Sequence, residues 1–295
     1  MDGRPLANGD HGRPIASIVI PAHNEGAVIA SNLSRLLATA QPGEFDVIVV
    51  PNACADETAA IAGTFDVRVI ETPVPGKARA IAIGDDACRT FPRVYLDADV
   101  QVSTESVRAL VSACNRPGVL ACAPVPRLDL TGVGHFVARV HRVHNTLMTP
   151  NRALAGVGVY LLTQTGHDRV FPMPPDVISD DGWVHASFTF QERLVATGAE
   201  SLVRPARTVG AHLRRRVRVR RGNRQLAGWN HSVPEVRLGL GSLVTHIRQR
   251  SVGPIDAGCY LSVLVADRAL SRFGRGREGG WGSDASSRVV EPASK

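Results

Sequence analysis

Ser17-Ile18-Val19-Ile20-Pro21-Ala22-His23-Asn24-Glu25 is the stretch that decides the fold, because a short β-branched strand ends there in a polar loop. An Ala-rich amphipathic pattern follows and predicts a helix over residues 25–38. A chain that alternates strand and helix in this way forms a parallel sheet with right-handed crossovers, so the fold class is α/β. Further strands are predicted at residues 47–50, 67–70 and 94–96, with helices at 56–62 and 77–88.

Polar residues follow three of these strands, at the edge where sheets of this kind bind ligands. They are residues 21–25, residues 51–56 (Pro-Asn-Ala-Cys-Ala-Asp) and Asp97-Ala98-Asp99. Asp56 and Asp99 also precede plausible helices, so turn formation and N-capping explain any one loop taken alone. Three polar loops on one edge favour a nucleotide and metal site.

Asp97-Ala98-Asp99 is the chemically informative loop. Two carboxylates that flank one residue at a strand end can face a hard divalent cation, Mg²⁺ or Mn²⁺, which also holds the phosphates of a nucleotide sugar. Such a cation stabilises the charge that develops as a diphosphate leaves. Because two aspartates at this spacing arise often by chance, the position of the pair carries the weight.

Composition restricts the remaining possibilities. The 295 residues are 44% hydrophobic, which suits one large α/β domain or two small ones with a shared core. The longest apolar runs fall short of the roughly 20 residues that cross a bilayer, and the polar N-terminal residues lack a signal-peptide pattern, so we expect a cytoplasmic protein. Five scattered cysteines without a C-x-x-C pair argue against zinc and disulfides. The net charge of +7 comes almost entirely from arginine, since the lysines are Lys77 and Lys295.

Four motifs carry a resemblance to a known family. Residues 17–25, residues 49–58, Gly76-Lys77-Ala78-Arg79-Ala80 and residues 97–99 are similar, in order and spacing, to family 2 glycosyltransferases with the GT-A fold. The resemblance extends over about residues 16–223. It implies a Rossmann-like α/β fold whose central sheet is mixed, mostly parallel and flanked by helices. It also implies an enzyme that uses a nucleotide-diphosphate sugar with Mg²⁺ or Mn²⁺.

The resemblance also implies a domain plan and roles for single residues. One GT-A domain covers residues 16–271, with the nucleotide-binding half at 16–100 and the acceptor-binding half with C-terminal helices at 101–271. Residues 1–15 are expected to be flexible and 272–295 to form a disordered tail. Asp99 coordinates the metal, Asp97 lies near the ribose or sugar, and Pro51 stands where many members carry Asp. The other donor-side residues are Pro21, Ala22 and Glu25 around the base and ribose, Asn52 near the base, and Lys77, which reaches toward the donor.

Two further motifs lie in the second half of the chain. Gly156-Val157-Gly158 precedes a predicted strand, where the glycines either let the backbone approach the donor sugar or allow tight strand packing. Ser179-Asp180-Asp181 begins a predicted helix, a place where acids are common for capping alone. It resembles the family motif Thr-Glu-Asp, which implies that Asp181 is the catalytic base, that Asp180 orients the acceptor and that the anomeric configuration inverts.

Residues 204–224 form the most basic segment, with nine arginines and no acid. By its charge alone it is a solvated helix face or a surface for nucleic acid or an anionic membrane. It is also similar to the family's Gln-Arg-x-Arg-Trp segment, although Arg215 and Val219 replace Gln and Trp. That resemblance makes Arg216 and Arg218 candidates for contacts to the diphosphate or the acceptor.

Two other functions compete with glycosyl transfer. A sugar-phosphate nucleotidyltransferase would also use a parallel sheet and paired aspartates, but it normally carries a Gly-rich basic loop after the first strand. An Arg-rich nucleic-acid-binding protein fits the charge, but scarce lysines and aromatics and the lack of a recognised motif argue against it, so no nucleic-acid partner is expected. The expected partners are a nucleotide-diphospho-sugar donor and a glycan, lipid-linked or small-molecule acceptor, with possible peripheral contact at the inner face of the membrane.

Overall fold

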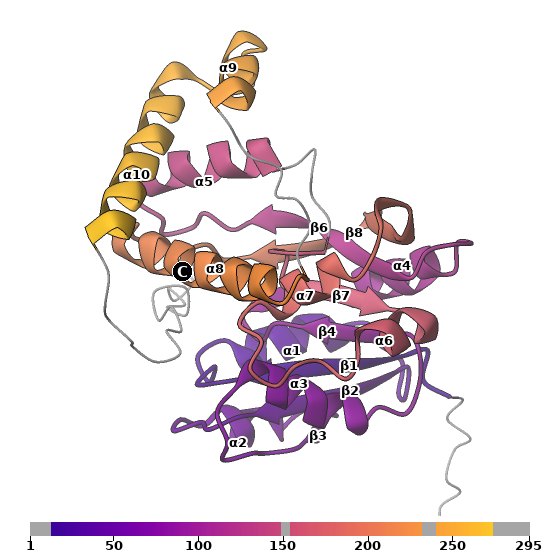
Figure 1. The fold of residues 1–295 in the computed structure, drawn as a ribbon. Helices are drawn as coiled ribbons and strands as arrows, with labels where there is room; N and C mark the ends of the chain where they lie inside the picture. The colour runs from indigo at the N-terminus through magenta and orange to yellow at the C-terminus, as the bar shows by residue number, and fades with distance from the viewer. Residues whose placement is uncertain (1–12, 149–153, 232–239, 274–295) are drawn as a thin grey trace, which may run out of the picture.

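The computed structural model describes residues 13–148, 154–231 and 240–273, and its centre is one eight-stranded sheet (Figure 1). The strand order is β3-β2-β1-β4-β7-β6-β8-β5. Apart from residues 13–15 and 272–273, the segments predicted to be flexible or disordered lie outside the described residues. The strands are β1 Ala16–Ala22, β2 Phe45–Pro51, β3 Arg68–Val69, β4 Arg93–Leu96, β5 Val100–Val102, β6 Ala121–Leu128, β7 Val159–Leu162 and β8 Arg193–Val203.

The first half of the sheet is parallel and the second half is mixed. Strand β1 pairs in parallel with β2 and β4, and β2 pairs in parallel with β3. Strand β7 is antiparallel to both β4 and β6, while β8 is parallel to β6 and antiparallel to β5. The predicted α/β fold with a mixed, mostly parallel sheet is confirmed. Since β2, β1 and β4 are parallel neighbours, their three polar loops leave the sheet at the same edge.

Two helical layers cover the sheet because its strands alternate between two buried faces. In β1, Ile18 and Ile20 belong to one core and Val19 to the other, which is the period-two pattern of a strand buried on both sides. Helices α1, α2 and α4 pack on the first core, and α3, α6 and α7 pack on the second. Their bounds are α1 Ile29–Leu37, α2 Thr58–Ala62, α3 Lys77–Asp86, α4 Thr104–Cys114, α6 Gln164–Val170 and α7 Asp180–Ala186; a 3₁₀ turn, η2 Phe190–Glu192, precedes β8.

A third group of helices lies beyond the second half of the sheet (Figure 1). This group consists of α5 His135–Met148, α8 Val209–Gly228, α9 Leu240–Arg248 and α10 Pro254–Phe273. Side chains such as Val143, Leu243 and Tyr260 form a separate small core between α5, α9 and α10. Within the described ranges, we find no helix with the length and apolar character needed to cross a membrane.

Two predicted helix starts shift, and one predicted helix is replaced by a strand. Helix α1 starts at Ile29 rather than near residue 25, because the Glu25 and Gly26 amides donate instead to Thr58 Oγ1 (2.8 Å) and Asp56 Oδ2 (2.9 Å). Helix α2 starts at Thr58, with Glu57 as its N-cap residue, and the Asp56 carboxylate accepts the Thr58 amide at 3.1 Å from the loop before it. The capping alternative for Asp99 is wrong, since strand β5 follows it and not a helix.

Candidate active site

A lysine and two aspartates from three separate elements meet at the carboxyl edge of the parallel strands. Lys77 Nζ lies 2.6 Å from Asp97 Oδ1 and 2.8 Å from Asp180 Oδ1. Lys77 is the first residue of α3, Asp97 directly follows β4, and Asp180 is the first residue of α7. The fold therefore joins the carboxylate that follows β4 and the carboxylate that begins α7 through a single ammonium group.

The position of Lys77 depends on a buried asparagine. Asn52, which is completely buried at the end of β2, donates from Nδ2 to the Ala22 carbonyl at 2.7 Å. Its Oδ1 accepts the Gly76 amide at 3.3 Å, and Gly76 has φ +140°, which a residue with a side chain rarely adopts. Asn52 thus ties the ends of two strands to the start of α3. The base contact expected of it stays a prediction.

Burial and charge act against each other on this cluster. Burial lowers the pKa of Lys77, but the carboxylates of Asp180, Asp97 and Asp181 together raise that pKa well above its ordinary value. Burial is also the largest influence on the pKa of Asp180. Together with the neighbouring carboxylates, burial raises this pKa to about 6, although Lys77 lowers it. The site is therefore held by a cation that several carboxylates share.

Asp181 has a different environment from Asp180. Its Oδ2 accepts the Gly156 amide at 2.6 Å, and its Oδ1 accepts the Ser179 hydroxyl and the Gly182 amide, both at 2.8 Å. Burial raises the pKa of Asp181, but Lys77 and these donors outweigh it, so the pKa lies below its ordinary value. Asp181 is also more accessible than Asp180, of which 5% is exposed.

The turn at Asp97-Ala98-Asp99 is held by backbone contacts. The Asp97 amide donates to the Gly158 carbonyl at 2.8 Å, and Asn32 Nδ2 donates to the Ala98 carbonyl at 2.5 Å. Gly158 has φ +69°, and a Cβ there would lie 2.6 Å from Val100 Cγ2 and 3.3 Å from Asp97 Oδ2. Close backbone approach to this turn accounts for Gly158. Gly156 also has a positive φ, and its amide contacts Asp181.

The remaining donor-side residues are placed as follows. Pro21, Ala22 and Glu25 are buried at the end of β1 and in the loop after it. Arg216 pairs with Asp267 on α10, with Nε 2.9 Å from Oδ2, whereas Arg218 on α8 is exposed. The structure thus brings Lys77, Asp97, Asp180 and Asp181 together and does not show Arg216 in that group. The donor contacts of the two arginines stay predictions.

Sequence reasoning missed three residues that shape the site. Asn32 holds the aspartate turn, and the available signal was a polar residue on the buried face of α1 beside Leu33. Ser179 was quoted only as part of a motif, yet its hydroxyl donates to Asp181. The Tyr160 hydroxyl is buried without a hydrogen-bond partner among the described residues, and Asp180 is the strongest of the charges that act on it. No sequence pattern distinguished Tyr160 from an ordinary core aromatic.

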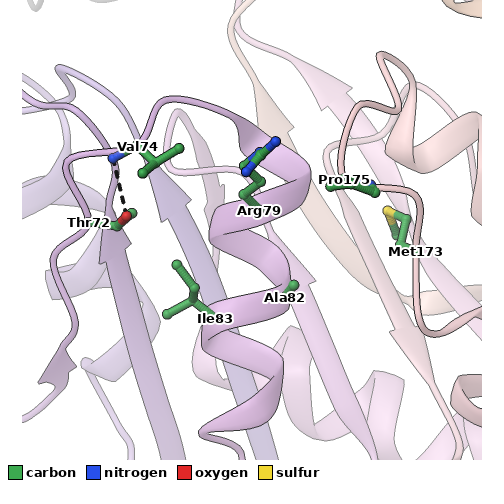
Figure 2. A pocket seen from close by; sticks show the side chains of 7 residues that line it. All are labelled: Thr72, Val74, Arg79, Ala82, Ile83, Met173 and Pro175. Atoms are coloured by element: carbon green, nitrogen blue, oxygen red, sulfur yellow. Dashed lines mark hydrogen bonds between the residues drawn. The ribbon is translucent and has the colours of Figure 1, made fainter.

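A small hollow lies beside the site rather than within it. Figure 2 shows the hollow, of about 270 Å³, between α3, the loop of Thr72 and Val74, and the segment of Met173 and Pro175. Arg79 lines it from α3. Arg79 follows Lys77 by two residues, so the two side chains leave the helix on opposite sides. The carboxylate cluster does not line this hollow.

The half-parallel sheet, the aspartate turn at its edge and the second acidic pair on α7 define the class of protein as a glycosyltransferase of the GT-A fold. Residues 17–154, a little under half of the chain, match the model of glycosyl transferase family 2. None of the curated proteins compared with this sequence matches it.

Two solved structures have the same fold. One is the mannosyltransferase PcManGT from Pyrobaculum calidifontis in complex with GDP-Man and Mn²⁺, which is 18% identical with a TM-score of 0.59 over 89% of this chain and 80% of that one. The other is glucosyl-3-phosphoglycerate synthase from Mycobacterium tuberculosis in complex with Mn²⁺, UDP and glucosyl-3-phosphoglycerate, which is 21% identical with a TM-score of 0.51 over 80% and 88% of the two chains. At these identities the likeness establishes the GT-A fold.

Proposed function

We propose that the protein transfers a sugar from a nucleotide-diphosphate sugar, of the UDP or GDP type, to an acceptor hydroxyl with inversion at the anomeric carbon. The observation that carries the proposal is the junction of Asp97 and Asp180 through Lys77 at the carboxyl edge of the sheet. It places the donor-side turn against the helix that bears the acidic pair. The two similar structures, which are complexes with GDP-Man and Mn²⁺ and with UDP and Mn²⁺, support this choice of donor.

The donor set at the aspartate turn fits a hard divalent cation. Asp97 and Asp99 are both partly exposed at the strand end, and carboxylate oxygens are the ligands that Mg²⁺ and Mn²⁺ prefer. Among the described residues, no three His, Cys, Asp or Glu side chains form a metal-binding group. Asp99 would therefore share the ion with phosphate oxygens and water, as Mg²⁺ sites commonly do. When bound, the ion would neutralise charge on the leaving diphosphate.

The chain's own residues supply positioning and a second positive charge. Lys77 is within ion-pair distance of Asp97, so its ammonium group lies beside the place where the diphosphate is expected. A charged group that is already oriented stabilises a developing negative charge without reorganisation during the reaction. Asn52 and Gly76 hold α3, and so Lys77, in that orientation.

Asp181 is the better placed of the two acids to act as a base. It is the more accessible acid, so an acceptor hydroxyl can reach its carboxylate, which is ionised at neutral pH as a base must be. Asp180 is buried and bound to Lys77, so its role in this proposal is to orient the acceptor through that pair. In the reaction Asp181 takes the hydroxyl proton as the acceptor oxygen attacks the anomeric carbon, and the nucleoside diphosphate leaves.

A hollow on the acceptor side has room for a sizeable group. It measures about 540 Å³ and lies between the end of β6 and helices α5 and α10. Its lining includes Arg142, Asn145 and Ser251, which can donate hydrogen bonds to hydroxyl or phosphate groups. Since β6 runs parallel to β4, this end of β6 points the same way as the strand end that bears Asp97. We assign the hollow to the acceptor.

A ligand screen tests the proposal directly. The melting temperature would be measured with UDP, GDP and other nucleoside diphosphates, each with and without Mn²⁺, because a ligand that binds only the folded state raises it. One diphosphate should raise it only when Mn²⁺ is present. Turnover with the matching sugar nucleotides, and the anomeric configuration of the product by NMR, then test transfer and inversion. Absence of any metal-dependent shift would refute the donor assignment.

A further inference from the structure

The outward side of α8 is strongly basic. Arg214, Arg218, Arg221 and Arg224 are exposed and follow one another at spacings of four, three and three residues, which places them on one side of the helix. Val217 lies among them and is 37% exposed. We call these five residues the outer face of α8.

The opposite side of the same helix uses its arginines internally. Arg216 and Arg220, four residues apart, both pair with Asp267 of α10, which is buried. This pair holds α8 against α10. Two arginines of α8 thus share one carboxylate inside the fold, whereas Arg214, Arg218 and Arg224 are exposed.

Few acidic residues lie on the helices around α8. Helices α5, α8, α9 and α10 contain Asp256 and Asp267, while α7, on the inner side of α8, begins with Asp180 and Asp181. Asp256 pairs with Arg139 on α5, and Asp267 pairs with the inner arginines of α8. Figure 1 shows one end of α10 next to α8, with the rest of α10 leading away from it. A surface with many cations and few carboxylates attracts polyanionic partners.

An aliphatic side chain among the arginines favours a bilayer over a nucleic acid. Val217 on the outer face is 37% exposed, and Trp229, just after α8, is 39% exposed and has its ring edge-on to Trp183. Basic residues interleaved with apolar ones suit the boundary between phospholipid headgroups and acyl chains, where Trp is also frequent. Single-stranded nucleic acid is usually held by aromatic platforms. Helix α8 itself contains no aromatic ring apart from His212, which is buried against His141.

We propose that the outer face of α8 docks on an anionic phospholipid surface, with its arginines against the lipid phosphates and Val217 at the headgroup boundary. The back of this helix contacts the acidic helix of the active site: a Cβ on Gly222 would lie 2.8 Å from Ser179 Cβ, and one on Gly182 would lie 3.0 Å from Leu226 Cδ1. Docking therefore places Asp180 and Asp181 close to the membrane. If the proposed function holds, this position suits a lipid-linked acceptor.

Vesicle co-sedimentation of the full chain tests the proposal. Wild-type protein should bind phosphatidylcholine vesicles that contain roughly one-third phosphatidylglycerol at about 0.1 M salt, and should not bind pure phosphatidylcholine. The triple variant Arg214→Gln/Arg218→Gln/Arg224→Gln should bind about 100-fold more weakly, at about fivefold per arginine. The corresponding triple Lys variant, which keeps the charge, should bind like wild type.

A matched control separates this face from overall charge. Arg13, Arg35 and Arg116 are exposed in the first half of the chain, so Arg13→Gln/Arg35→Gln/Arg116→Gln removes the same charge elsewhere and should leave vesicle binding intact. Equal losses in the two Gln triples would overturn the assignment to α8. Tighter binding of wild-type protein to single-stranded RNA than to anionic vesicles at equal salt would make the face a nucleic-acid site instead. Vesicle binding needs no turnover, so its failure is distinguishable from failure of the proposed function.

Discussion

Replacing Lys77 with methionine should destabilise the protein, because it removes the cation that Asp97 and Asp180 share. The apolar stem is retained, so the loss is electrostatic. Removing one partner of a buried ion pair costs about 3–5 kcal/mol, and the lower end applies here because the Lys77 side chain is 28% exposed while that of Asp180 is 7% exposed. We therefore expect the free energy of unfolding to fall by about 3 kcal/mol in urea titrations.

A second substitution identifies the cause of that loss. With Lys77→Met, Asp180 is left as a buried charge without its partner, so adding Asp180→Asn should restore most of the stability. Arg127→Met is a matched control, because Arg127 and Glu200 form an exposed ion pair, and this variant should unfold near the wild-type midpoint. If Lys77→Met unfolds like wild type, or if Asp180→Asn gives no recovery, the electrostatic account of the cluster is wrong.

Three further predictions concern the metal, the base and pH. Asp99→Ala should lose Mn²⁺-dependent nucleotide affinity by calorimetry, while nucleotide binding unchanged from wild type would refute the metal assignment. Asp181→Asn should lower turnover roughly 100- to 10,000-fold with donor affinity nearly intact. Asp180→Asn should chiefly weaken acceptor binding. If both variants turn over at a near-normal rate, the two aspartates only cap the helix. Although burial lowers the pKa of His167, its hydrogen bond to Asp85 raises the pKa above the ordinary 6.5. The stability from this contact is fully present below pH 6.5 and is lost as the pH rises through the folded-state pKa of His167. In urea titrations, His167→Gln should therefore lower the free energy of unfolding more at acidic than at alkaline pH. An equal loss at both pH values would refute this pH dependence.

Much of the first half of the fold was predictable because its signals are local. The strand at β1 and the helix at α3 follow from β-branched runs and apolar periodicity within a few residues. The helix starts were less accurate, since the Glu25 and Gly26 amides bond to side chains from the next loop, a contact that only the folded chain makes. The mixed order of the second half was expected from the family resemblance and not from periodicity.

Site residues show the same division. The positions of Asp97, Asp99, Asp180 and Asp181 at a strand end and a helix start could be inferred from motifs. That Asn32 supports the aspartate turn could not, because its partner is a backbone carbonyl on a different element.

The sequence by itself determined the α/β class, the polar edge of the sheet and the acidic motifs, since each depends on residues that are neighbours in the chain. The tertiary structure decided which charges meet: Lys77 joins Asp97 to Asp180, and Asp267 pairs with Arg216 and Arg220 of α8. The physical reason is that a charged side chain takes whatever partner the packing of distant elements brings within a few ångströms, and neither periodicity nor motif spacing records that distance.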